Sequence, residues 1–550
     1  MALNLASPGI VIREVDLTIG RVDGTSGSIG ALVAPFTKGP VEEAQLIESE
    51  EDLLQTFGQP YSVDKHYEYW MVASSYLAYG GTMQVIRAND SGLKNATDDG
   101  SPELLIKSNT HYNQLGYDDN VITGTVVAAK TPGSYANGIR VSIIDSKADQ
   151  ILTVAGVGTV GMGVTQSVAN RVVAGAAGTS LLDGYLKGIV TGIDTTAGTA
   201  EVKVLSHVSN AGTITNVDYQ ANGVYCFKAN EVIGIETAGS NVGSGGTATV
   251  TNQVDWFEQQ EIVLTTKDGN GNPIKLEWDS LAEAPGTSAY AQARGGRFDE
   301  VHVVVIDDKG EITGNAGTIL EKHLSLSKAS DAEYSVGSTA YWRKYLANVS
   351  KYIYGGSGPT GIVTTGFDSA TATAIGSLDT DNAWDQPADS ADKGFGVFGV
   401  FTASLTGGKN YGGKTDYTTT GALNSGLDDL ISGYELFSNT EEIEVDFILM
   451  GAAHHVKEQS QALAEKVIAV AEARKDAVAF ISPFRQAFLN DSSVGSVTVN
   501  NIDTITNSVI EFYAPITSTT YGVFDSGYKY MFDRFNNTFR YVPLNGDIAG

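Results

Sequence analysis

The 550-residue sequence has a single cysteine, Cys226, and no apolar run approaching the roughly 18 residues needed to span a bilayer. One thiol excludes an internal disulfide framework and Cys-rich zinc sites. The N-terminal stretch MALNLASPGIVIREVD lacks a basic segment followed by a long apolar one, so no secretory signal is expected. These absences indicate a soluble chain that is made in a cytoplasm and does not insert into a membrane.

Basic residues are also scarce. There are 35 Lys and Arg residues against 64 Asp and Glu residues, which leaves a net charge of −29. Binding to a nucleic-acid backbone depends on cations that neutralise phosphates, and no cluster of Lys or Arg interleaved with aromatic residues is present. Direct binding to nucleic acid is therefore not expected.

The length and the pattern of apolar residues predict a multidomain fold of mixed α+β and α/β type. Strands and helices alternate in residues 23–90 and again in 318–515, which are expected to form one discontinuous α/β core domain. Between them, 91–317 has short Val/Ile/Thr runs separated by Gly, Asn and Ser turns, which predicts an inserted, protruding β-rich region. This region is expected to contain two units, and the outer one, 151–255, is rich in glycine.

Local signals place several elements of the core. Ser49 is positioned to cap a helix over SEEDLLQTFG that Gly58 ends. The strands IEVDFILM (443–450) and AVAFIS (477–482) flank a helix at 455–475, which predicts a βαβ unit with parallel strands. GFGVFGVFTASL (394–405) is expected to be a buried strand of the same domain.

Residues 1–22 are expected to form an extended N-terminal arm. In PGIVIREVD, Ile10, Ile12 and Glu14 lie on one side of a strand, and Val11, Arg13 and Val15 lie on the other. Because neither side is cleanly apolar, this strand is better suited to pairing with another element than to lying on its own core.

The stretch GGKNYGGKT (407–415) fits a phosphate-binding pattern from Gly408 to Thr415. A working phosphate loop needs a helix that begins at the Lys-Thr pair, whereas the next helix is expected only near Leu427. Asp307, at the end of VHVVVIDD, could hold magnesium but lies far upstream. A flexible glycine-rich loop is the favoured interpretation.

No other pattern forms a catalytic constellation. GVGTVG (156–161) fits G-x-G-x-x-G, but the residues that follow it do not show apolar side chains at helical spacing. The pair His454-His455 opens a helix after a core strand, but no third ligand is spaced to join it. Cys226 has no histidine close to it in the sequence. We therefore expect no catalytic residue, no metal ligand and no cofactor.

Eight separate stretches resemble, in order, the sheath protein of contractile bacteriophage tails. They are SPGIVIREVD (7–16), SIGALVAPFTKGPV (28–41), EDLLQTFGQP (51–60), YLAYGGTMQVIRA (76–88), TPGSYANGIRVSIID (131–145), SLTGGKNYG (404–412), AEARKDAVAFISP (471–483) and GYKYMFDRFNNTFRYVPLNGDIAG (527–550). The resemblance implies that the glycine-rich loop belongs to a family that carries it without nucleotide chemistry.

The resemblance also implies a structural protein and not an enzyme. Sheath subunits stack as rings of six around a tail tube, and a signal from the baseplate triggers contraction, which drives the tube through the host cell envelope without ATP. The implied partners are neighbouring sheath subunits, the tail tube protein, and the baseplate and tail terminator proteins. The implied location is the virion, after assembly in the cytoplasm of the host bacterium.

In this family, arms exchange β-strands between neighbouring subunits. By resemblance, the strand-exchange arm of this chain consists of Ser7, Pro8, Gly9, Ile10, Val11, Ile12, Arg13, Glu14 and Val15. Residues 516–550 resemble the start of the family's C-terminal, tube-proximal domain, which continues beyond GDIAG. The chain is thus expected to lack that further stretch, and a 550-residue form is not expected to build a contractile sheath alone.

Two functions from other classes stay open. A P-loop-like nucleotide hydrolase that uses 408–415 predicts ATP affinity that is lost on Lys414→Ala. A β-rich surface-recognition protein predicts a specific ligand for 91–317. A sheath from a related contractile injection machine is compatible with the same resemblance.

Overall fold

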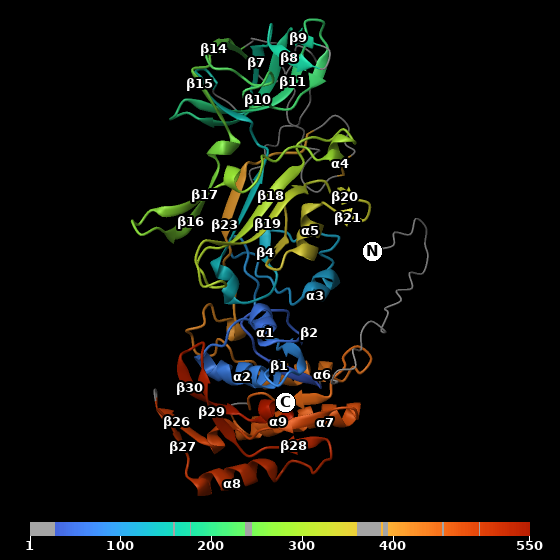
Figure 1. Ribbon diagram of the computed structural model, residues 1–550, viewed down its shortest axis with the longest axis vertical. Helices are drawn as coiled ribbons and strands as arrows, with labels where there is room; N and C mark the ends of the chain where they lie inside the picture. Colours follow the sequence, from blue (N-terminus) through green and yellow to red (C-terminus); the bar gives the residue numbers. More distant parts are fainter. Residues whose placement is uncertain are drawn as a thin grey trace. The chain divides into compact units, whose positions relative to one another are not determined.

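The computed structural model describes residues 28–157, 160–175, 178–236, 245–359, 387–388, 394–453, 456–493 and 496–550. These residues form two compact units, which are described separately (Figure 1). Unit 1 comprises 122–127 and the described part of 138–404, and unit 2 comprises 28–121, 128–137 and the described part of 405–550. Several sheets and helices are present, so the expected multidomain fold of mixed α and β type is confirmed at this level.

Unit 2 is built on a six-stranded sheet with the order β2-β3-β1-β24-β25-β28. All neighbouring pairs are parallel except β2 with β3. The strands are β1 (Ile29–Ala34), β2 (Ala44–Ile47), β3 (Thr82–Arg87), β24 (Phe447–Leu449), β25 (Val478–Ile481) and β28 (Gly522–Phe524). The helix α7 (Lys457–Arg474) connects the parallel strands β24 and β25, which confirms the predicted βαβ unit.

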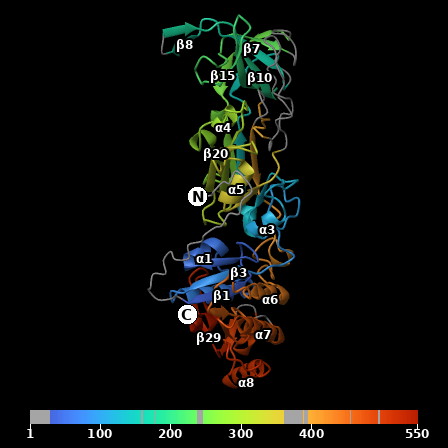
Figure 2. The same cartoon turned by 90° about the vertical axis from the view of Figure 1, so that its right-hand side faces the viewer.

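Both faces of this sheet are covered, because successive residues of β1 enter different cores. Ala31 and Val33 pack into a cluster with α7, α6 (Leu427–Leu436) and Phe512 of α8 (Ile502–Tyr513). Leu32 and Ala34 pack on the opposite face with α1 (Glu50–Phe57), α2 (His66–Leu77) and α9 (Asn545–Ala549). Figure 2 shows α6, α7 and α8 of unit 2 from the side. Parallel strands covered on both faces are apolar at nearly every position.

The predicted ends of α1 are confirmed. Ser49 Oγ accepts a hydrogen bond from the backbone N–H of Asp52 at 3.2 Å. Gly58 ends the helix with φ 84°, a conformation that glycine adopts without a side-chain clash.

Unit 1 contains two larger antiparallel sheets. The first has the order β14-β13-β7-β10-β11-β6-β15, with β12 beside β11, and the second has the order β19-β18-β5-β23. The first consists of β6 (Gln150–Thr153), β7 (Gly163–Ser167), β10 (Tyr185–Asp194), β11 (Thr199–Val208), β12 (Ile214–Asn216), β13 (Val232–Glu236), β14 (Thr247–Thr249) and β15 (Asn252–Asp255). The second consists of β5 (Ile139–Asp145), β18 (Glu300–Asp307), β19 (Thr318–Ser327) and β23 (Val400–Ser404).

The strand expected within 394–405 exists as β23, but its place differs from the expectation. It pairs with β5 in the antiparallel sheet of unit 1, and its residues are half-buried. A short apolar run shows that a strand exists but does not show which strand pairs with it. A buried ion pair between Lys328 and Asp145 (2.8 Å) lies beside this sheet, and Asp145 also accepts the backbone N–H groups of Phe398 and Gly399.

A buried carboxylate connects the end of the unit 2 sheet to the C-terminal residues. Asp525 follows β28 and accepts hydrogen bonds from the Ser482 hydroxyl and from the backbone N–H of Gly527. Asn545 Nδ2 donates to the same Ser482 hydroxyl at 2.8 Å. Burial raises the pKa of Asp525 from 3.8 to about 6.

Asp525→Asn is expected to stabilise the protein at pH 7.5 and to have little effect at pH 4. Because the pKa is raised in the folded state, the folded protein gains stability when Asp525 is protonated and loses it as the pH rises through about 6. The difference amounts to at most about 3 kcal/mol. Calorimetric melting temperatures of D525N and wild type between pH 4 and 8 measure it, and the exposed Asp503→Asn is the control. A variant that is less stable than wild type at pH 7.5 would contradict the expectation.

Candidate subunit interface

The hairpin of β29 (Tyr528–Asp533) and β30 (Thr538–Pro543) in unit 2 carries an exposed aromatic face. Tyr530 lies opposite Tyr541, and Phe532 lies opposite Phe539, with ring centroids 4.7 Å and 5.2 Å apart. The side chains of Tyr530, Phe532 and Phe539 are 60%, 47% and 57% exposed. Large apolar side chains gathered on one surface mark a contact site for another molecule.

The opposite face of the hairpin is fixed to α2 and α9. Val542 is buried in the cluster that contains α2, and the Arg540 guanidinium lies 4.4 Å from the ring centre of Tyr67. Lys529 Nζ donates to Ser75 Oγ at 2.6 Å and pairs with Asp547 at 2.7 Å. Since side chains alternate along a strand, the hairpin uses one face for its own core and leaves the aromatic face outside.

The turn of the hairpin is organised by Asp533, which is fully buried. Its carboxylate accepts the backbone N–H groups of Phe535 and Asn536 at 3.0 and 3.1 Å, and it pairs with Arg540 at 3.0 Å. Asn537 adopts a positive φ of 50°, which asparagine tolerates in tight turns.

Both outer edges of this hairpin are open within the described part of the chain, because β29 and β30 pair only with each other. An open edge presents backbone N–H and C=O groups to which a further strand can bind. The expected arm, Ser7–Val15, lies outside the described residues. The arm therefore stays a prediction, and the hairpin edges were not anticipated from the sequence.

The glycine-rich loop lacks the geometry of a phosphate loop. Tyr411–Gly413 form a single 3₁₀ turn, and Lys414 has φ −72° and ψ 143°, so no helix begins there. The next helix, α6, begins at Leu427, as expected. A helix N-terminus facing the loop is what would bind phosphate, and it is missing from 408–415.

Backbone N–H groups of the loop already donate hydrogen bonds to side chains within unit 2. The Gly408 N–H donates to Asn137 Oδ1 at 2.8 Å, and the Gly412 N–H donates to Asp90 Oδ1 at 2.9 Å. The Asn410 side chain donates to Ser134 Oγ at 2.9 Å. These hydrogen bonds connect the loop to segments of unit 2 that are far away in the sequence. Its glycines allow the backbone to approach those segments closely.

Asp307 does not present a free carboxylate for magnesium. It accepts the backbone N–H groups of Glu311, Ile312 and Thr313 at 3.0, 3.0 and 2.7 Å, and the Thr313 hydroxyl at 2.9 Å. These bonds close the loop after β18. Asp307 also belongs to unit 1, whereas 408–415 belongs to unit 2.

The remaining candidates give no site either. The strand β7, and not a helix, follows GVGTVG. His454 and His455 lie outside the described residues. Cys226 is buried, and burial raises the pKa of its thiol. Within the described ranges, no group of three His, Cys, Asp or Glu residues could hold a metal ion, and no helix is long and apolar enough to cross a membrane.

Comparison with known proteins gives full-length similarity to one class of protein. No family model matches the chain. The tail sheath protein of Enterobacteria phage T4 is 23% identical over 582 aligned residues, which cover 100% of this chain and 72% of the relative. The tail sheath proteins of Vibrio phage KVP40 and Salmonella phage ViI are 23% and 21% identical, covering 100% and 99% of this chain and 73% and 69% of each relative.

The chain is similar over its whole length to bacteriophage tail sheath proteins. The resemblance drawn from the eight sequence stretches is therefore confirmed. The crystal structure of a sheath tail protein from Listeria innocua is also similar, at 10% identity and a TM-score of 0.28, covering 94% of this chain and 68% of that one. A structural role in a tail sheath is the function that the sheath relatives support.

Replacing Phe532 and Phe539 by serine is expected to reduce self-association of this sheath relative without unfolding it. Both side chains are about half exposed, so the folded state loses little buried apolar surface. Sedimentation velocity at rising concentration measures association, and calorimetry measures stability.

The control for this pair lies on the other face of the same hairpin. Val542→Ala removes buried methyl groups and is expected to cost about 1–3 kcal/mol of stability. If F532S/F539S destabilised the protein as much as V542A and left association unchanged, the aromatic face would be part of the core and not an interface.

Proposed function

We propose that the chain is the structural subunit of a contractile phage tail sheath. It polymerises as rings of six around the tail tube and contracts to drive the tube through the host cell envelope. The observation that carries the proposal is similarity to three phage tail sheath proteins over practically the whole chain. The exposed aromatic hairpin with open edges supports self-association.

The connection between neighbouring subunits in this proposal is strand addition. The arm Ser7–Val15 of one subunit pairs with an open edge of the β29–β30 hairpin of another. Ile10 and Ile12 then lie on one face of the enlarged sheet, next to exposed aromatic side chains. Main-chain hydrogen bonds hold the neighbours together while other contacts change during contraction.

The partners in this proposal are neighbouring sheath subunits, the tail tube protein, and the baseplate and tail terminator proteins. The location is the virion, after assembly in the host cytoplasm. The proposal keeps a β-rich region within 91–317 that protrudes from the sheath and 516–550 as the opening of the tube-proximal domain, whereas unit 1 of the structure continues to 404 and unit 2 includes 91–121 and 128–137. Because its relatives are structural sheath proteins, no catalytic activity and no cofactor are proposed.

A proline test in the arm separates strand pairing from side-chain contact. Val11→Pro and Arg13→Pro together remove two backbone N–H groups and are expected to abolish higher-order assembly, since proline cannot donate to a ladder. Val11→Thr with Arg13→Thr keeps both donors and a high strand propensity, so it is expected to assemble. Negative-stain microscopy and sedimentation of the protein expressed through to its gene's own stop codon measure the outcome. Assembly of the proline variant at the level of the threonine variant would contradict strand exchange through this arm.

A further inference from the structure

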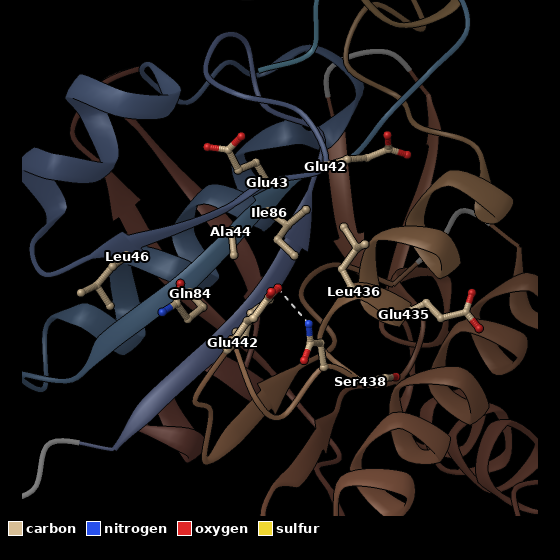
Figure 3. Close-up of a pocket in the computed structure, with 12 residues that line it drawn as sticks. Glu42, Glu43, Ala44, Leu46, Gln84, Ile86, Glu435, Leu436, Ser438 and Glu442 are labelled. Carbon is tan, nitrogen blue, oxygen red and sulfur yellow. Dashed lines mark hydrogen bonds between the residues drawn. The ribbon is translucent and has the colours of Figure 1, made fainter. Parts of the chain in front are cut away.

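A groove of about 790 Å³ lies at one edge of the unit 2 sheet, over β2 and β3 and beside the C-terminal end of α6 (Figure 3). Its apolar lining comes from Leu46, Ile86, Leu436 and Ile443. It also contains four glutamates, Glu42, Glu43, Glu435 and Glu442. None of the described residues that line the groove is Lys, Arg or His.

Two of the four glutamates already form ion pairs with lysines of the chain. Glu42 pairs with Lys107, and Glu435 pairs with Lys466 at 2.7 Å. The other two, Glu43 and Glu442, form no ion pair with any residue that the structure describes. Glu442 Oε2 only accepts the Asn439 amide at 2.9 Å, as the dashed line in Figure 3 shows.

The Glu43 carboxylate is only partly satisfied by groups of the described chain. Its Oε1 accepts a hydrogen bond from Gln45, but its Oε2 is enclosed and has no hydrogen-bond partner within the described chain. Leaving an enclosed carboxylate oxygen without a donor costs free energy, which a donor from outside would recover. The C-terminal end of α6 adds the negative partial charge of the helix dipole to the same place.

The floor of the groove includes an open strand. β2 is the last strand in the sheet order, and it pairs on one side only, with β3, among the strands described. Leu46 on β2 is 53% exposed. An open edge next to apolar and acidic side chains fits an extended segment that carries apolar and basic residues in alternation.

We propose that this groove binds an extended, basic segment of a different protein, which adds to β2 as a strand and places Lys or Arg side chains against Glu43 and Glu442. The N-terminal residues 1–27 of the chain itself do not match this charge, since Arg13 and Arg21 are outnumbered by Glu14, Asp16 and Asp23. With a net charge of −29, a second copy of the chain is a poor source of such a segment. The groove is separate from the hairpin β29–β30, so the sheath proposal does not depend on it.

The first test is a titration of the full chain into a fluorescein-labelled peptide of roughly eight residues that alternates Lys and Val, followed by anisotropy. We expect binding at about 0.05 M salt that weakens as salt is added, because solvent ions screen the charges. Glu43→Gln with Glu442→Gln is expected to weaken it about tenfold. A peptide that alternates Glu and Val is expected not to bind.

Two controls make the outcome decisive. Glu441→Gln with Glu444→Gln removes the same charge from exposed positions outside the groove and is expected to leave the affinity nearly unchanged. A Lys/Val peptide that is N-methylated at alternate residues keeps its charge but cannot pair as a strand, so it is expected to bind much more weakly. No binding of the Lys/Val peptide, or equal weakening by both glutamine pairs, would overturn the proposal. Undiminished binding of the methylated peptide would overturn strand addition.

Discussion

The attachment of one hairpin face to α2 is the constraint on which the proposed interface depends. A two-stranded hairpin alone is only marginally stable in water. Here Val542 is buried against the α2 core, Arg540 stacks on Tyr67, and Asp533 fixes the turn. With its inner face held in this way, the hairpin can leave its aromatic face and both edges available. A mobile hairpin would collapse its aromatic side chains onto the nearest apolar surface.

The covered parallel sheet of unit 2 explains where contacts with other molecules can form. Internal clusters cover both of its faces, so a further strand can pair with the described sheet only at an edge, or with the attached hairpin. The two kinds of edge differ in chemistry, since the hairpin edges adjoin aromatic side chains and the β2 edge adjoins glutamates. In the two proposals, this difference separates the partners by charge as well as by shape.

The glycine-rich loop shows why a phosphate-binding pattern carries no chemistry by itself. Phosphate binding requires free amides at the beginning of a helix. In this chain, Asn137 and Asp90 accept hydrogen bonds from backbone N–H groups of the loop, and no helix begins at Lys414. The same applies to Asp307, whose oxygens are used to close its own loop. Hydrogen bonds decided both cases: the loop amides donate to side chains far away in the sequence, and Asp307 accepts from residues a few positions ahead.

Features that depend on neighbouring residues could be predicted from the sequence alone, such as the Ser49 cap, the stop at Gly58, the βαβ unit around α7 and the delayed start of α6 at Leu427. The similarity to tail sheath proteins could also be found from the sequence, because short stretches in a fixed order carry it. The pairing of β23 with β5, the exposure of Phe532 and Phe539, and the presence of Glu43 and Glu442 in the lining of one groove were decided only in the tertiary structure. Strand pairing and surface exposure depend on contacts between residues hundreds of positions apart, and no local pattern records them.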